Sequence, residues 1–105
     1  MDPTLRVLLD RVARVVRKGE RAVELTQREF ALLQCLSNHR GNPVSTADLR
    51  AYVWGDQVLA VETGTIVGVY VFHLRKKLTS LGLGNAITTA RGFGYGLAPL
   101  PADMK

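Results

Sequence analysis

The stretch LRKKLTSLGLGNAITTARGFGYG, residues 74–96, decides the fold that we expect for this chain. Its first part is basic and amphipathic, which is typical of a helix, and its last part holds two strand-like segments around glycines, which predicts a β-hairpin. Arg91 lies at the tip of that hairpin. A helix can enter the major groove of DNA and an arginine on a hairpin can enter the minor groove, so this order indicates a nucleic-acid partner.

Length and charge limit the classes of protein that fit. The 105 residues predict one domain, residues 1–105. The net charge of +5 and the pI of 9.9 suit an anionic partner such as nucleic acid, with an ordinary basic domain as the alternative. We see no signal-peptide pattern and no apolar run long enough for a bilayer, so we expect a cytoplasmic protein without a membrane partner.

The sequence holds no pattern that indicates catalysis or metal binding. Cys35 is the only cysteine, which excludes an intramolecular disulfide and a cysteine-based zinc site, and its apolar neighbours predict a buried thiol. His39 and His73 lie far apart in the sequence, and no nucleophile–base or carboxylate-pair motif occurs. We therefore expect no enzyme activity, no cofactor and no metal.

An antiparallel sheet is predicted over residues 5–25. Lys18-Gly19 fits a two-residue turn, and that register sets Arg17 opposite Glu20. The sheet carries the densest basic stretch of the chain, which fits a solvated face better than a binding surface. Its members are Arg11, Arg14, Arg17, Lys18 and Arg21.

Two capping signatures open a three-helix core over residues 26–80. Thr26 and Glu29 form a Thr-x-x-Glu capping box, after which three apolar residues fall on one helix face. Ser45 and Asp48 repeat the signature before a short second helix that ends at Gly55. The predicted apolar faces are Phe30, Leu33 and Leu36 in the first helix, stopped by Gly41 and Pro43, and Leu49, Tyr52 and Val53 in the second.

Residues 55–62 form a mixed polar and apolar connection, which is either a packed connector or a protein contact. The next segment has conflicting signals. Residues 65–72 are rich in β-branched and aromatic residues, which favours a strand. However, Val67, Val71, Leu74 and Leu78 form one stripe at helical spacing, so we predict a helix over residues 63–79 in which Gly68 costs about 1 kcal/mol relative to alanine.

The opposite face of this third helix carries Thr65, Val69, Phe72 and Lys76. Exposed apolar side chains on a basic helix can touch thymine methyl groups; the alternative is that a neighbouring element buries Phe72. Residues 80–85 are a connector. A hairpin follows over residues 86–98, with strands at 87–90 and 95–98, and Gly92 and Gly94 are expected to supply positive φ at its tip.

Five blocks in this order resemble the winged-helix effector domain of OmpR/PhoB-type bacterial response regulators, the regulators of two-component phosphorelay systems. Together with the basic sheet before them they cover nearly the whole chain. The resemblance implies an α+β winged helix-turn-helix with an N-terminal antiparallel β-sheet, three helices and a C-terminal β-hairpin wing. The blocks are LTQREFALL (25–33), VSTADL (44–49), VWG (53–55), VGVYVFHLRKKL (67–78) and ITTARGFGY (87–95).

The resemblance also implies a function and its residues. The third helix would read the major groove of double-stranded DNA, and Arg91 would enter the minor groove. Residues 55–62 match a segment that touches RNA polymerase in some relatives, members commonly bind promoter direct repeats as dimers, and a receiver domain normally precedes this one. The predicted DNA-binding residues are Trp54, Thr65, Val69, Tyr70, Phe72, His73, Arg75, Lys76, Lys77, Thr89, Arg91 and Tyr95.

The chain departs from the family pattern where bases are read. The family usually has an acid at Gly68, basic residues at Phe72 and His73, and a polar residue at Gly64. Phosphate and minor-groove contacts are therefore better supported than hydrogen bonds to bases. Sequence-selective DNA binding for transcriptional regulation is the leading prediction. The alternative is a winged-helix module for protein interaction or self-association whose DNA readout has degenerated.

Overall fold

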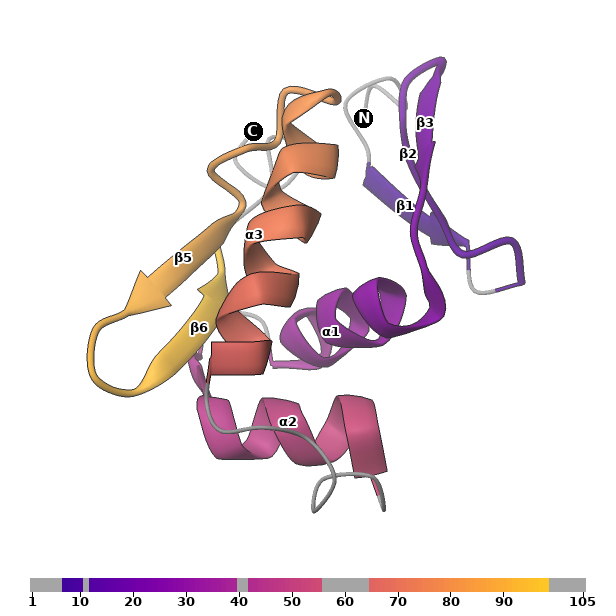
Figure 1. Cartoon of the computed structure of the whole chain (residues 1–105). Helices are drawn as coiled ribbons and strands as arrows, with labels where there is room; N and C mark the ends of the chain where they lie inside the picture. Colours follow the sequence, from indigo (N-terminus) through magenta and orange to yellow (C-terminus); the bar gives the residue numbers. More distant parts are fainter. Residues whose placement is uncertain (1–6, 11, 40–41, 56–64, 99–105) are drawn as a thin grey trace.

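The computed structural model describes residues 7–10, 12–39, 42–55 and 65–98, with backbone only for residues 7–9 and 65. The predictions at Arg11, Gly41, Gly64 and residues 56–63 lie outside this part. The described residues form three helices and two small sheets (Figure 1). The elements are β1 (Val7–Asp10), β2 (Val15–Lys18), β3 (Arg21–Glu24), α1 (Gln27–Asn38), β4 (Val44–Ser45), α2 (Thr46–Trp54), α3 (Thr65–Thr79), β5 (Ile87–Ala90) and β6 (Gly94–Leu97).

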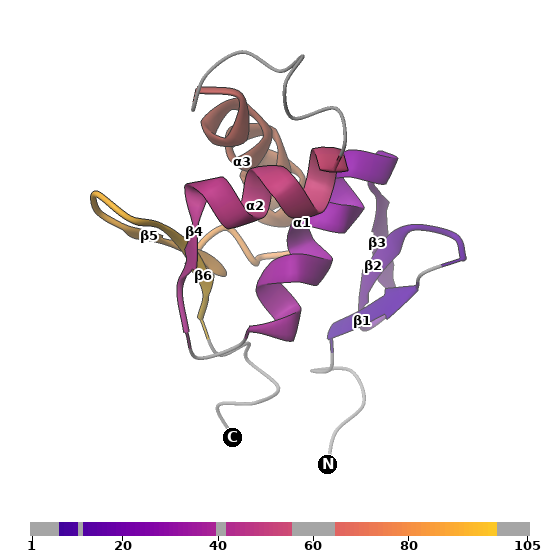
Figure 2. The same cartoon turned by 90° about the horizontal axis from the view of Figure 1, so that it is seen from below.

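The two sheets lie on opposite sides of the helices. β1, β2 and β3 form an antiparallel meander, and β4, β6 and β5 form the second sheet, whose β5–β6 hairpin projects as the wing (Figure 2). Because both sheets and all three helices of the described part contribute to one apolar cluster, the predicted winged-helix arrangement is confirmed. Its fully buried members include Val16, Leu32, Leu36, Leu49, Val67, Leu74 and Leu78.

The β2–β3 turn differs from the prediction by one residue. Lys18 pairs with Arg21 and Arg17 with Ala22, so the turn residues are Gly19 and Glu20, and the expected Arg17–Glu20 pair is wrong. Gly19 has φ 63°, which places the glycine at the first central position, as in a type II′ turn. The conformational requirement of the turn therefore set the register, rather than a cross-strand charge pair.

α1 begins as its sequence predicts. The hydroxyl of Thr26 accepts from the Glu29 amide at 3.2 Å, and the Glu29 carboxylate accepts from the Thr26 amide at 2.9 Å, which completes the capping box. Phe30, Leu33 and Leu36 are buried, as predicted.

α2 also begins at its predicted cap and ends at Gly55, which has φ 55°. Ser45 accepts from the Asp48 amide at 3.0 Å. The sequence predicts Tyr52 on the apolar face, but Tyr52 is exposed and Trp54 is buried instead. The helix is nine residues long and packs on one side only, so its last turn directs the tryptophan inward and the tyrosine outward.

α3 resolves the conflict between strand propensity and helical spacing in favour of the helix. Val67 and Val71 are buried whereas Val69, between them, is 47% exposed. A strand would have placed these three valines on one face, because side chains alternate with a period of two. Burial of the stripe against α1 and α2 therefore outweighed the local preference of the β-branched residues.

The two glycines of the wing have different structural roles. Gly92 has φ 78°, as expected for the tip. The prediction of a positive φ at Gly94 is wrong. Gly94 is the first residue of β6, which starts one residue earlier than predicted and ends at Leu97. A Cβ added at Gly94 would lie 1.9 Å from the Val44 carbonyl oxygen, so a glycine is needed for the close approach of β6 to β4.

Candidate nucleic-acid interface

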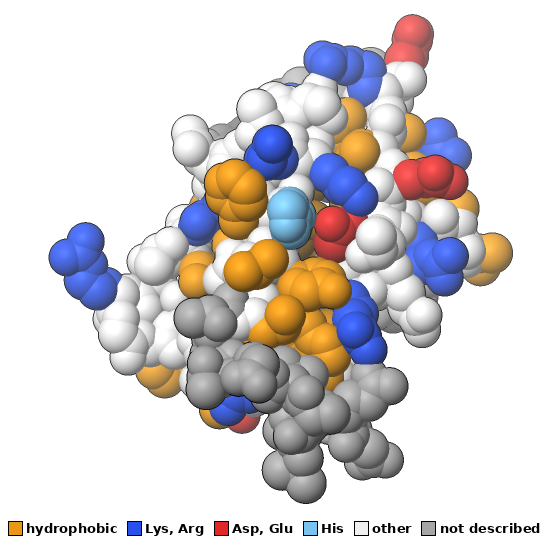
Figure 3. Space-filling model, viewed as in Figure 1, with side chains coloured by type: hydrophobic (Ala, Val, Ile, Leu, Met, Phe, Trp, Pro, Cys, Tyr) orange, Lys and Arg blue, Asp and Glu red, His pale blue; other side chains and the backbone are white. Residues whose placement is uncertain are grey.

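The exposed face of α3 and the wing lie beside each other on the described structure (Figures 1 and 3). Phe72 on this face is 58% exposed, so the alternative in which a neighbouring element buries it is wrong. The Lys76 ammonium lies 5.6 Å from the centre of the Phe72 ring, and the centres of the Phe72 and His73 rings are 5.6 Å apart. The helix therefore presents an apolar surface bordered by basic side chains.

Arg75 does not point freely from this face. Its Nε and Nη2 donate to the Ile87 carbonyl at 3.3 and 2.8 Å, and Nη2 also donates to the Thr89 hydroxyl at 2.9 Å. The guanidinium carbon lies 5.8 Å from the centre of the Tyr95 ring. We call this set the Arg75 bridge. It ties α3 to β5 and β6, and the phosphate contact expected of Arg75 stays a prediction.

Lys77 is directed to the opposite side, toward α1. Its ammonium donates to the Glu29 carboxylate at 2.6 Å, and the Glu29 side chain is only 6% exposed. Burial by itself would raise the pKa of Glu29, but hydrogen bonds from Lys77 and Thr26 and the positive charge of Lys77 together hold that pKa below its ordinary value. Lys77 thus serves the capping box, which makes it a weak candidate for the phosphate contact that we expected.

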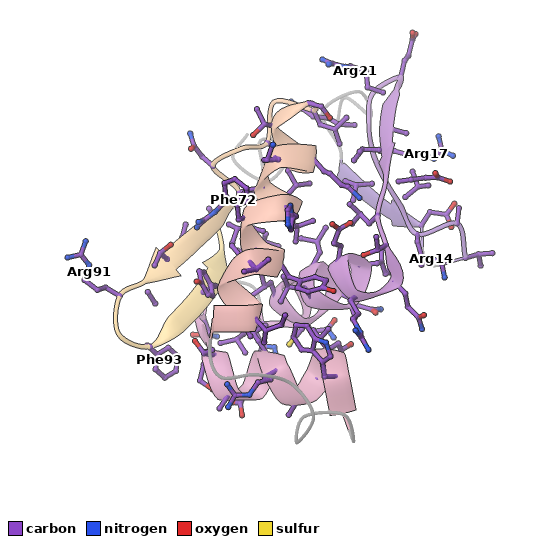
Figure 4. All side chains as sticks on the ribbon, in the orientation of Figure 1. Arg14, Arg17, Arg21, Phe72, Arg91 and Phe93 are labelled. Atoms are coloured by element: carbon purple, nitrogen blue, oxygen red, sulfur yellow. The ribbon has the colours of Figure 1, made fainter. Side chains whose placement is uncertain are left out.

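The wing tip is exposed yet anchored. Arg91 projects away from the body of the described structure (Figure 4). The backbone behind it is held to the start of α2, because the Phe93 carbonyl accepts from the Thr46 amide at 3.0 Å. Val44 also pairs with Tyr95. An exposed arginine on a hairpin that is held by hydrogen bonds is well placed to reach into a groove.

Trp54 and Tyr70 were expected near the phosphate backbone. Their rings meet edge to face with centroids 5.2 Å apart, and Trp54 is buried while Tyr70 is half-buried. Burial makes Trp54 a core residue and leaves its indole little surface for a ligand. Tyr70 faces a shallow hollow between α1 and α3, lined by Thr26, Gln27, Arg28, Glu29, Val69, Tyr70 and His73.

Sequence reasoning missed Arg28 and Phe93. Arg28 lines the hollow, and its guanidinium carbon lies 5.7 Å from the Trp54 ring centre. A cation in the first turn of a helix opposes the helix dipole, and that unfavourable placement was the available signal. Phe93, at the wing tip, is exposed. An aromatic residue between two glycines was the corresponding signal there.

The basic residues of the N-terminal sheet divide into two groups. Lys18 donates to the Leu81 carbonyl at 3.4 Å and Arg21 donates to the Ser80 carbonyl, just beyond the C-terminal end of α3. Cations at this end of a helix are favoured by its dipole. Arg17 on β2 and Arg14 in the turn before β2 are exposed, on the side away from the wing (Figure 4). Their distance from the wing fits a solvated face.

Two other kinds of site are not found in the described part of the chain. None of its helices is both long and apolar enough to cross a membrane. No group of three or more His, Cys, Asp or Glu residues among the described positions could hold a metal ion. Cys35 is buried, and burial followed by the charge of Asp48 raises the pKa of its thiol, which disfavours the reactive thiolate.

Comparisons with known proteins agree with this geometry. Residues 19–97 match the family described as "Transcriptional regulatory protein, C terminal". The response regulator MprA of Mycobacterium tuberculosis is 37% identical over 93 residues, which are 89% of this chain and 40% of that protein. The chain therefore spans well under half the length of the relative that it matches.

Two solved structures are similar in both sequence and fold. The DNA-binding domain of Bacillus subtilis CssR has a TM-score of 0.73 and 30% identity, over 88% of this chain and 99% of that one. The DNA-binding domain of Klebsiella pneumoniae RstA, solved in complex with RstA box, has a TM-score of 0.71 and 32% identity, over 89% of this chain and 91% of that one.

Proposed function

Because the chain belongs to the family of transcriptional regulatory protein C-terminal domains, we propose that it binds double-stranded DNA sequence-selectively and regulates transcription. α3 lies in the major groove and Arg91 enters the adjacent minor groove. The observation that carries this proposal is the exposed face of α3 beside an exposed wing arginine, with the Arg75 bridge between them. The net charge of +5 and the DNA-binding relatives support it.

The exposed basic and polar side chains supply affinity through phosphates, and this part of the affinity falls steeply with salt. Lys76, His73 and Thr89 are exposed near the groove-facing surface, and Arg28 joins them from α1. Tyr95 is half-buried, with its ring centre 5.8 Å from the Arg75 guanidinium carbon, and it is a further candidate for a contact with the phosphate backbone of DNA. Thr65, at the start of α3, remains a candidate whose side chain lies outside the described atoms.

The rest of the regulatory system is also part of the proposal. MprA is a response regulator, and this chain matches 40% of its length, so we place a receiver domain in the full-length protein under phosphorelay control. The chain binds promoter direct repeats as a dimer, and residues 55–62 contact RNA polymerase. We also propose that the protein acts in the cytoplasm, as expected for a protein that binds DNA.

Fluorescence anisotropy with a random duplex pool at low and moderate salt tests the DNA interface. Arg91→Ala should weaken binding by about 5- to 150-fold if the wing enters the groove. Arg17→Ala is the matched control, because it removes the same charge from an exposed position on the other side of the described structure (Figure 4). It should change the affinity by less than about twofold, consistent with a solvated arginine.

The outcomes separate the two functions considered. Equal losses for Arg91→Ala and Arg17→Ala would mean non-specific attraction and would refute the wing assignment. No duplex binding at low salt would refute DNA binding and favour the protein-interaction module. Selection of one sequence from the pool would establish that binding is selective.

A further inference from the structure

Building on the proposed DNA binding, we infer that α3 reads thymine: the side chains of Val69 and Phe72 contact C5-methyl groups in the major groove. The two residues are 47% and 58% exposed and three positions apart, so they are neighbours on one face of the helix. The thymine methyl is the apolar group that base pairs present in the major groove, and it distinguishes a thymine from the other three bases.

The alternative means of base readout are weak on this face. Gly68 has no side chain, and a Cβ there would meet the Tyr95 hydroxyl at 3.6 Å. Arg75 donates to β5, and Lys77 is paired with Glu29. Two of the three long hydrogen-bond donors on this part of α3 are therefore directed elsewhere, and the third, Lys76, lies over the Phe72 ring. Apolar contact is the chemistry that the middle of the helix offers.

The charge around Val69 and Phe72 favours DNA over an apolar protein partner. Lys76 lies against the Phe72 ring, and Arg28 and His73 line the hollow beside Val69 (Figure 3). A protein that covered Phe72 would also have to desolvate the Lys76 ammonium, which is costly without a paired anion. In a groove, the same ammonium faces the phosphates that flank the base pairs. The apolar surface and its basic border thus fit one occupant, a duplex with thymines in the major groove.

Uracil substitution tests this inference because deoxyuridine differs from thymidine only by the C5 methyl. A duplex selected from a random pool is resynthesised with uracil at each thymine position in turn, and affinities are measured by anisotropy. At one or two positions uracil should weaken binding about fourfold, the change that corresponds to burial of one methyl group. In a duplex with cytosine at the same positions, replacing that cytosine by 5-methylcytosine should strengthen binding, because it restores a C5 methyl group.

The assignment to side chains is tested by thermodynamic cycles. Phe72→Ala or Val69→Ala should abolish the uracil penalty at the position that each side chain contacts. Tyr52→Ala is the control, since Tyr52 is an exposed aromatic residue on α2 and should leave every uracil penalty unchanged. Phe72→Arg is a second variant, which should shift the selected sequence toward guanine at the contacted position, because arginine donates to guanine O6 and N7.

The results separate this inference from the proposed function. If the duplex binds with Arg91 dependence but uracil changes the affinity nowhere, thymine readout is wrong and DNA binding stands. Uracil penalties that persist in both alanine variants would also overturn the inference, because another group would then read the methyl. Absence of duplex binding would overturn the proposed function itself.

Discussion

Alanine at Gly94 should lower the free energy of unfolding by about 3 kcal/mol, whereas alanine at Gly68 should raise it by about 1 kcal/mol. At Gly94 the new Cβ would lie 1.9 Å from the Val44 oxygen and 2.9 Å from the Ser45 Cα. Both are backbone atoms of β4, so β6 has to move away from it. The upper part of the usual range for overpacking therefore applies.

At Gly68 an added Cβ would cause no steric clash with a described atom. The nearest described atom to a Cβ there is the Tyr95 hydroxyl at 3.6 Å, which is an ordinary contact. The helix gains the propensity difference between alanine and glycine. Gly92→Ala is an intermediate case, since no described atom lies within 4 Å of its Cβ but its φ is 78°, and it should cost about 1–2 kcal/mol.

Urea unfolding followed by circular dichroism measures all three variants against the parent chain. For a domain of this size, 1 kcal/mol corresponds to about 4–8 °C in Tm, so the three variants should be clearly ordered in a thermal scan as well. A Gly94→Ala variant no less stable than Gly92→Ala would refute the close-approach explanation. A destabilising Gly68→Ala would refute the assignment of free space on α3.

Two further predictions concern the polar contacts of α3. The pKa of Glu29 is lowered in the folded state, so its contribution to the free energy of unfolding is present above its ordinary pKa of 4.5 and is lost as the pH falls through the lower folded pKa. Glu29→Gln should therefore be less stable than the parent chain at pH 7, and the difference should shrink as the pH falls below 4.5 in urea titrations. A difference that stays constant between pH 7 and pH 3 would contradict this. Arg75→Lys keeps the charge but loses the planar guanidinium that reaches both Ile87 and Thr89. If the Arg75 bridge positions the wing, Arg91→Ala should cost less binding free energy in the Arg75→Lys background than in the parent chain. Strictly additive losses of binding free energy would show that the bridge does not position the wing.

Local chemistry explains why much of the fold was predictable. The Thr26 and Ser45 caps and the buried stripe on α3 involve residues within one helix or beside it, and each was predicted from its spacing. The prediction of the β2–β3 register was wrong because Gly19 belongs to two possible turn dipeptides, Lys18-Gly19 and Gly19-Glu20, and only the backbone geometry selects one of them. The role of Gly94 depends on β4, which lies about fifty residues earlier in the chain. No pattern of neighbouring residues in the sequence indicates the close approach of β6 to β4.

The exposure of the candidate site was predictable only in part, because Trp54, a predicted site residue, is buried; the contacts of the site were not predictable. Val69 and Arg91 are exposed as expected, and Phe72, whose exposure the sequence left open, is exposed as well. Arg75 and Lys77 look equivalent to Lys76 in sequence, because all three are basic residues on consecutive positions. Their separation by about 100° around the helix axis sends one to the wing, one to the groove-facing side and one to Glu29.

This separation has a consequence for salt dependence that adjacent substitutions can reveal. Lys76→Gln should reduce the slope of log affinity against log salt by about 1, because Lys76 faces the phosphates of the proposed complex. Lys77→Gln removes the same charge one residue later, yet it should leave the slope unchanged, because the ammonium is already paired with the Glu29 carboxylate at 2.6 Å. Lys77→Gln should instead lower the free energy of unfolding, so both variants are titrated with duplex at a temperature where circular dichroism shows them folded. If the two variants lower the slope equally, the Lys77–Glu29 pair opens on DNA and α3 meets the phosphates with both lysines. If only Lys76→Gln does, phosphate binding and the support of α1 are divided between neighbouring residues of one helix.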